Sequence, residues 1–479
     1  MTEMDQKDSD SDQSKAEVSP ELLKQLRELV WTYQSVGQLD TAIYWADKLV
    51  TLGDADIAED VYSLGQCLVA ARQFHRAAHT VMRADLHLSH LGCCYTAARA
   101  LHAVQETDEA LAIIEHVTEE VLPGELKHAE DSDPRRNAMI SNLYLLKGQI
   151  YEGRDNRQAA AECYKVAVRT DLTCVEAMTA LTSHQMLSLD EERDLVSGLA
   201  QSQQPPTELS DLVSHLYWGS LKKYSEVKVA GLLPGPASDK WAACLKDNSD
   251  VRVSELERLY YNCDHHAAIN LSTDILKQDP HHPACLPIHV ALLVELNKTS
   301  DLFKLSHSLV DLFPEWCVAW YAVGCYYYST GRQDPARRYL EKATKQDIMF
   351  GPAWLAYGHS FAVENEHDQA MAAYFKASQL MAGCHLPQLY IGLEYSLTNN
   401  TQHAEMFFSQ ALEIAPNDPF VLHELGVTAF SSGHYERAEK YLSDALLRVE
   451  SVARLEQVLN RTCNVRYIYF QKWSELGAV

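Results

Sequence analysis

The sequence predicts an all-α fold in which pairs of helices repeat to form a right-handed solenoid, and two observations lead to that prediction. Glycines and alanines recur at one fixed interval through the second half of the chain, and prolines punctuate the same register. The glycines of this register are Gly324, Gly358, Gly392 and Gly426. Self-similarity at a fixed period is typical of repeat architectures. We therefore expect the 479 residues to form an array whose core grows with each added repeat.

Two alanine columns share this period, and together with the glycines they define one repeat. They comprise Ala336, Ala370, Ala404 and Ala438, and then Ala343, Ala377, Ala411 and Ala445. A 34-residue unit with the pattern W-x₂-L-G-x₂-Y followed by Ala, an aromatic residue and Ala is typical of tetratricopeptide repeats, and the clearest copy begins WLAYGHSF at Trp354. Glycine disfavours a helix by about 0.8–1.0 kcal/mol relative to alanine, so its recurrence inside a helix indicates that helices approach closely there.

Extending the register along the chain predicts the domain organisation. Pro280, Pro314 and Pro416 fall where second helices should stop, because proline cannot continue a helix. In the first half the repeat is looser, and the first alanines of its second helices are expected at Ala42, Ala77, Ala110 and Ala160. The predicted segments are a disordered acidic tail (1–19), N-terminal repeats (20–190) with an insertion near 118–137, an irregular connecting segment (191–248), six contiguous 34-residue repeats (249–452) and an atypical C-terminal tail (453–479).

Composition narrows the classes of partner. The chain has 41 Lys and Arg against 66 Asp and Glu, a formal net charge of −25, so phosphate backbones and acidic membranes are disfavoured. The sequence contains no uninterrupted apolar run of about 18 residues, the length that would predict a transmembrane helix. The 12 cysteines include no CxxC pair and most of them fall in helical apolar patterns, which indicates reduced side chains acting as small hydrophobes. We expect a soluble intracellular protein without nucleic-acid or membrane partners.

Motifs that carry chemistry are missing from the sequence. It contains no GxGxxG, Walker A, HExxH or GxSxG string, so we expect neither catalysis nor a cofactor. His282, Cys285 and His289 have spacings that could place them on one helical face, as metal ligands require. No fourth ligand is evident, and these positions fall in columns that pack against neighbouring helices. The packing interpretation is therefore stronger, and no metal is expected.

The strongest functional signal is the concave face of the solenoid, which the first helices of successive repeats line. Its columns are apolar, and the sequence predicts a groove for an extended or helical peptide. The alternative is that the same residues are core covered by other parts of the chain. Chaperone-binding repeats hold a carboxylate with Lys, Arg and Asn, which these columns lack. The predicted groove residues are Tyr321, Cys325, Tyr328, Leu355, His359, Leu389, Leu393, Phe420, Val427 and Phe430.

Longer strings carry a more specific resemblance. Residues 351–400, together with VGCYYY, CLPIHVALLVELNK, YYNCD and LTSHQML, resemble the subunit 6 family of the anaphase-promoting complex, also called the cell division cycle protein 16 family. The resemblance extends from about residue 23 to about 447. It implies a non-catalytic scaffold in a multisubunit ubiquitin ligase that directs the degradation of mitotic regulators during cell-cycle progression and division, with the ligase chemistry carried by other subunits.

The resemblance also implies partners and a location. Members of the family bind other subunits of the complex and pair as homodimers through their N-terminal repeats, here residues 23 to about 190. They hold the extended N-terminal segment of a small accessory subunit in the C-terminal superhelix. The expected location is the nucleus and cytoplasm, with the spindle and centrosome in mitosis.

One departure from the family follows Leu447. The family continues with further repeats and a polar acidic tail, whereas this chain ends RLEQVLNRTCNVRYIYFQKWSELGAV, which fits no repeat column. An alternative splice product and a mistaken gene model both remain open as explanations, and loss of part of the groove and reduced solubility are expected. Two other functions also stay open: a different tetratricopeptide adaptor, such as a co-chaperone or trafficking scaffold, and the helical-repeat arm of an enzyme.

Overall fold

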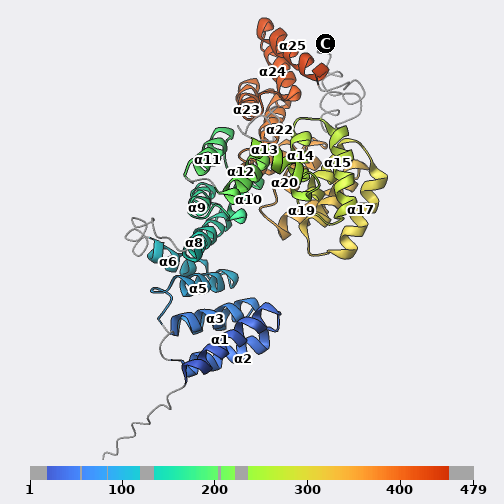
Figure 1. Ribbon diagram of the computed structural model, residues 1–479. Helices are drawn as coiled ribbons and strands as arrows, with labels where there is room; N and C mark the ends of the chain where they lie inside the picture. Colours follow the sequence, from blue (N-terminus) through green and yellow to red (C-terminus); the bar gives the residue numbers. More distant parts are fainter. Residues whose placement is uncertain are drawn as a thin grey trace, which may run out of the picture. The chain divides into compact units, whose positions relative to one another are not determined.

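A computed structural model describes residues 19–53, 57–83, 85–118, 134–202, 207–221 and 236–451. These residues form α-helices joined by short turns, and no strand occurs among them, which confirms the predicted all-α repeat fold (Figure 1). None of the described helices is long and apolar enough to cross a membrane. The chain divides into two compact units, residues 1–174 and 175–479.

The first unit stacks antiparallel helix pairs, and contacts between successive helices carry its core. The alanines predicted from the looser first-half register, Ala42, Ala77, Ala110 and Ala160, are all fully buried. Gly148 lies against the ring of Tyr164, where an added Cβ would come within 2.5 Å of Cε1. The helices are α1 (Pro20–Ser35), α2 (Leu39–Leu52), α3 (Ile57–Ala70), α4 (Phe74–Arg83), α5 (Leu91–Ala103), α6 (Thr107–His116), α8 (Pro134–Gly153) and α9 (Arg157–Thr170).

The second unit contains the regular repeats, each an antiparallel pair of helices. Contacts are densest within a pair, as between α18 and α19 or between α22 and α23. Its helices are α10 (Val175–Ser183), α11 (Leu189–Ser202), α12 (Glu208–Ser220), α13 (Pro236–Cys244), α14 (Ser249–Tyr261), α15 (His265–Gln278), α16 (Cys285–Glu295), α17 (Thr299–Leu312), α18 (Cys317–Ser329), α19 (Gln333–Gln346), α20 (Gly351–Ala362), α21 (His367–Leu380), α22 (His385–Leu397), α23 (Thr401–Ile414), α24 (Pro419–Ser431) and α25 (Tyr435–Ser451).

The glycine column is where the two helices of a repeat touch. A Cβ added at Gly358 would lie 2.4 Å from Cε1 of Tyr374, and one added at Gly392 would lie 2.5 Å from Cε1 of Phe408. Tyr374 is completely buried, as is Phe408. These two glycines therefore make room for an aromatic ring from the facing helix, and Gly324 and Gly426 make room in the same way for Leu340 and Leu442. This is the close approach that the sequence period predicts.

The turn between the two helices of each repeat has the same period as the glycine column. One residue per turn adopts a positive φ, between 52° and 80°. Asparagine and glycine, which tolerate the left-handed conformation best, occupy five of the six positions, and a cysteine occupies the sixth. The positions are Cys263, Asn297, Gly331, Asn365, Asn399 and Gly433. The backbone thus repeats in the same register as the side chains.

Three of the predicted segments fall wholly or mainly outside the described residues: the acidic tail apart from Ser19, the insertion near 118–137 apart from its edges, and the C-terminal tail. The segment 191–248, expected as an irregular connection, contains most of α11 together with α12 and α13. α12 begins with a capping box, in which Thr207 accepts a hydrogen bond from the Ser210 amide and Ser210 Oγ accepts one from the Thr207 amide.

Candidate functional site

A cavity of about 130 Å³ opens in the second unit, on the side where the first helices of successive repeats meet. Its walls come from α14, α16, α18, α20 and α22 and from the turns beside them. Most of the lining is aliphatic or aromatic. The residues are Tyr260, Tyr261, Cys263, His265, Pro287, Ile288, Ala291, Val294, Glu295, Tyr321, Cys325, Tyr328, Pro352, Leu355, Ala356, His359, Met381, Cys384, His385, Leu386, Tyr390 and Asp418.

Half of the groove residues expected from the sequence line this cavity, namely Tyr321, Cys325 and Tyr328 of α18 and Leu355 and His359 of α20. The other half do not. Leu389 and Leu393 are buried in the core beside α23, Phe420 packs partly buried against the same core, Val427 is partly buried, and Phe430 is 51% exposed on α24. Contact of any of these residues with a partner stays a prediction.

Several lining residues that the sequence reading missed belong to the same columns one or two repeats earlier. Pro287, Ala291 and Val294 occupy on α16 the positions that Tyr321, Cys325 and Tyr328 occupy on α18, one repeat later. Tyr260 stands one further repeat before Val294. Extending the same columns by 34 residues into the two preceding repeats would have identified these residues. His385 and Asp418 had no such signal, because they face the cavity from helix starts outside these columns: His385 is the first residue of α22, and Asp418 precedes α24.

The polar groups of the cavity are held by other side chains of the repeats. His385 Nε2 lies 2.7 Å from Asp418 Oδ2, and both side chains are at most 2% exposed. Asp418 also caps α24, because its Oδ1 accepts hydrogen bonds from the amides of Phe420 and Val421. His359 Nδ1 lies 2.7 Å from the hydroxyl of Tyr374. These contacts fix the walls of the cavity.

Burial also sets the protonation of the phenols and thiols that face the cavity. It raises the pKa of Tyr261 and of Tyr321 well above the ordinary value for tyrosine. Burial raises the pKa of the Cys325 thiol to about 12. A thiol with so high a pKa carries almost no thiolate at neutral pH, so Cys325 suits apolar contact and not nucleophilic chemistry. These phenols and thiols therefore offer apolar contact and hydrogen bonding and no nucleophile.

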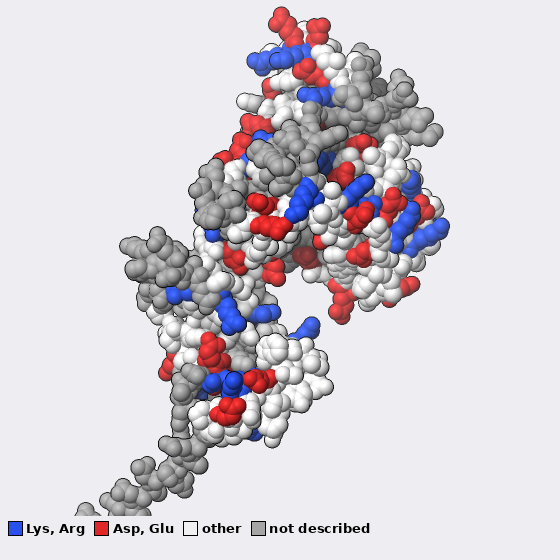
Figure 2. Space-filling model, in the orientation of Figure 1, with Lys and Arg blue, Asp and Glu red and all other residues white. Residues whose placement is uncertain are grey.

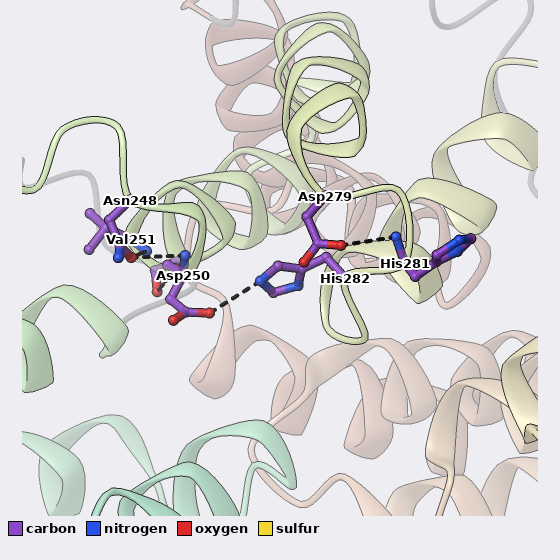
Figure 3. Close-up of polar contacts among 7 residues, drawn as sticks. Asn248, Asp250, Val251, Asp279, His281 and His282 are labelled. Atoms are coloured by element: carbon purple, nitrogen blue, oxygen red, sulfur yellow. Dashed lines mark hydrogen bonds and ion pairs between the residues drawn. The ribbon is translucent and has the colours of Figure 1, made fainter.

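The three residues weighed as metal ligands each have a separate structural contact. His282 is buried, and its Nε2 lies 3.1 Å from Oδ1 of Asp250, a residue of α14 (Figure 3). In the turn just before His282, Asp279 Oδ1 accepts a hydrogen bond from the His281 amide. Cys285 Sγ lies 3.9 Å from the carbonyl oxygen of Ser272, and His289 Nδ1 lies 2.8 Å from the Ser272 hydroxyl. Among the described residues no group of three His, Cys, Asp or Glu side chains is placed to hold a metal ion.

The charge around the cavity is acidic. The described residues that line it include Glu295 and Asp418 but no Lys or Arg. On the face drawn in Figure 2, basic side chains lie singly or in small groups among acidic ones. A ligand with a terminal carboxylate would find no cation among these lining residues to pair with.

Comparison with known proteins places the chain among subunits of one complex. A family model described as anaphase-promoting complex, cyclosome, subunit 3 matches residues 35–117, and a tetratricopeptide-repeat model matches residues 318–347 and 391–418. The human protein called cell division cycle protein 16 homolog is 45% identical over 444 residues, which cover 90% of this chain and 70% of the human protein. Anaphase-promoting complex subunit 6 of Arabidopsis thaliana is 32% identical over a match that covers 90% of this chain and 81% of the Arabidopsis protein.

A solved structure agrees with these relatives. The crystal structure of the anaphase-promoting complex hetero-tetramer Cut9–Hcn1 contains a chain that is 29% identical to this one, with a TM-score of 0.75. The match covers 90% of this chain and 80% of that chain. Similarity therefore extends over both compact units and is not confined to the regular repeats.

Proposed function

This chain belongs to the subunit 6 family of the anaphase-promoting complex, the cell division cycle protein 16 family, and from that premise we propose that it is a scaffold subunit of this ubiquitin ligase. In that role it supports ubiquitin-dependent degradation of mitotic regulators while other subunits carry the ligase chemistry. The observation that carries the proposal is 45% identity to the human relative over 90% of the chain.

A role without catalysis agrees with the chemistry of the cavity. Its buried histidine and carboxylate are held against each other, and its thiol at Cys325 has a pKa raised to about 12 by burial. A repeat solenoid offers long surfaces rather than a single reactive centre, and this suits a protein that binds several neighbours. We assign binding to the surfaces of the two units and no reaction step to the chain.

The cavity is the proposed site for an extended N-terminal segment of a small accessory subunit. Its walls combine aromatic rings with acidic groups at Glu295 and Asp418, which favours an apolar segment without carboxylates of its own. The related Cut9 chain was solved together with Hcn1. The same charge pattern argues against the co-chaperone alternative, in which an acidic C-terminal peptide would be gripped.

The N-terminal unit is the proposed site of homodimerisation. On α1 and α2 and in the turn between them it exposes large apolar side chains, with Trp31 72% exposed, Val36 67% and Tyr44 57%. Exposed aromatic residues grouped in this way are typical of protein interfaces. We also propose that the protein resides in the nucleus and cytoplasm, and at the spindle and centrosome in mitosis.

The decisive experiment for the scaffold role is affinity purification of the tagged chain from dividing cells, followed by mass spectrometry. We expect other subunits of the anaphase-promoting complex to be recovered. Two variants then separate the proposed surfaces: Leu355→Glu in the cavity should release the small accessory subunit, whereas Leu312→Glu, at a position that is 56% exposed and outside the cavity, should not. Recovery of no subunit of the complex would refute the scaffold assignment and leave the fold untouched.

The dimer has its own test. Light scattering after size exclusion should give the mass of two chains for the unmodified protein and of one chain for the double variant Trp31→Ser, Tyr44→Ser. The control is Leu88→Ser, a change at another exposed apolar position of the same unit (37% exposed) that should keep the dimer mass. A monomer mass for the unmodified protein at micromolar concentration would contradict the dimer proposal.

A further inference from the structure

In a linear solenoid each repeat contacts only its neighbours along the chain. Among its described residues, the second unit departs from this rule beside the cavity. The amide of Gly383, in the turn between α21 and α22, donates a hydrogen bond of 2.7 Å to the carbonyl oxygen of Gln185, in the turn between α10 and α11. Eleven helices, α11 to α21, lie between these two turns in the chain, so the bond joins repeats that are far from consecutive.

Side-chain contacts extend this interaction to the turn that follows α14 and to the start of α24. Gln185 is buried, and its Nε2 donates a hydrogen bond of 3.0 Å to the hydroxyl of Tyr261, the last residue of α14. Two residues further on, Cys263 Sγ lies 3.9 Å from Oδ2 of Asp418, the capping residue of α24. We call this set of contacts, made by Gln185, Tyr261, Cys263, Gly383 and Asp418, the seam.

The sequence of the turn at Gly383 supports a specific role for this contact. A Cβ added there would lie 2.9 Å from the carbonyl oxygen of Leu187 and 3.0 Å from that of Gln185, so backbone atoms fill the space of a side chain. At the equivalent turn positions of three other repeats, one or two repeats away, the chain has Glu315, Met349 and Asn417. Among these four turns, glycine occurs only where the seam crosses.

The seam runs along one wall of the cavity. Tyr261, Cys263 and Asp418 line the cavity themselves, and Gly383 lies between the lining residues Met381 and Cys384. The seam therefore joins upstream and downstream repeats beside the cavity and holds this wall together.

We propose that the seam is a latch: it encloses whatever occupies the groove, and it must open before the interior of the groove can be reached. The latch rests on the proposed function only in its biological use, as the step that would control loading and release of an accessory segment. The device itself is a property of this chain alone, and it can be measured without a partner.

The test uses iodoacetamide as a small probe of access, with labelling at each cysteine followed by mass spectrometry on the whole purified chain. Cys263 and Cys384 line the cavity beside the seam and are at most 7% exposed, whereas Cys285 and Cys317 are buried outside the cavity. Gly383→Val should force the seam apart. We expect labelling of Cys263 and Cys384 to become at least ten times faster, with the rates at Cys285 and Cys317 unchanged.

Matched variants guard against a general loss of stability. Glu315→Val places the same side chain at the equivalent turn two repeats earlier, where the native residue is exposed, and should leave all four rates unchanged. Gln185→Ala removes only the hydrogen bond to Tyr261 and should give a smaller acceleration at Cys263 and Cys384. Unchanged rates at these two cysteines in both seam variants, or a parallel rise at all four cysteines, would overturn the latch. Failure to recover an accessory subunit would instead refute only the groove assignment.

Discussion

The sharpest prediction concerns the glycine column, because replacement of Gly358 sets two opposing effects against each other. In an ordinary helix, Gly→Ala stabilises by about 0.8–1.0 kcal/mol. Here the new Cβ would lie 2.4 Å from Cε1 of Tyr374, a ring that is fully buried and whose hydroxyl is held by His359. Overpacking a closed core costs about 1–3 kcal/mol. The 2.4 Å approach places the cost in the upper part of this range, about 2–3 kcal/mol, and the helix gain offsets about 1 kcal/mol of it. We therefore expect Gly358→Ala to destabilise the second unit by about 1–2 kcal/mol, and Gly358→Leu by more.

Circular dichroism melting and urea unfolding measure this effect, and two glycines of the same unit serve as controls. At about 2–4 °C per kcal/mol for a domain of this size, Gly358→Ala should lower the melting temperature by about 2–8 °C. Gly198→Ala, at an exposed helical position with nothing within 4 Å of the new Cβ, should raise it slightly. Gly426→Ala should change it little, because its neighbour Leu442 is 37% exposed and can move toward solvent. A rise for Gly358→Ala equal to that for Gly198→Ala would refute the packing argument.

Three further predictions follow from contacts elsewhere in the chain. Arg27 donates two hydrogen bonds, of 2.8 and 2.9 Å, to the carboxylate of Asp60, whose side chain is 3% exposed. Arg27→Met should therefore destabilise the first unit by about 1–3 kcal/mol in urea unfolding. An unchanged unfolding midpoint would show that the pair contributes nothing to stability. Burial lowers the pKa of His289 from 6.5 to about 4, so protonation favours the unfolded chain and the free energy of unfolding falls between about pH 6.5 and pH 4. His289→Gln should remove about 1–2 kcal/mol of the stability that the unmodified protein loses between pH 7 and pH 5. Identical profiles of unfolding free energy against pH for the two proteins would contradict this prediction. Leu446 and Leu447 are 60% and 62% exposed on α25. Changing both to Glu should raise the protein concentration at which light scattering detects aggregates. An unchanged threshold concentration would exclude these two side chains as the cause of aggregation.

The repeat was predictable from the sequence because its geometry is local. A glycine in one helix and an aromatic residue 16 positions later in the next must face each other wherever two helices are joined by a short turn, as Gly358 and Tyr374 do. The tryptophans obey the same rule: the indole nitrogens of Trp320 and Trp354 donate hydrogen bonds to the carbonyl oxygens of Pro314 and Ile348, six residues before each. Spacing alone therefore implies the contact.

The cavity was only partly predictable. Its columns on α18 and α20 follow from the period, but the sequence pattern does not distinguish a column that faces open space from one that packs into the core, so Leu389 and Leu393 were grouped with Tyr321. Both classes are apolar at helical spacing. Which of them is covered depends on how far the downstream repeats curve, a property of several repeats together.

The sequence by itself determined the helix pairs, their 34-residue register, the glycines that admit aromatic rings and the family to which the long strings point. Only the tertiary structure decided that His385 contacts Asp418 and that Gly383 contacts Gln185, a residue near the start of the second unit. The reason is geometric. Small rotations between successive repeats add up along the array, and no local pattern records where their sum brings distant turns together.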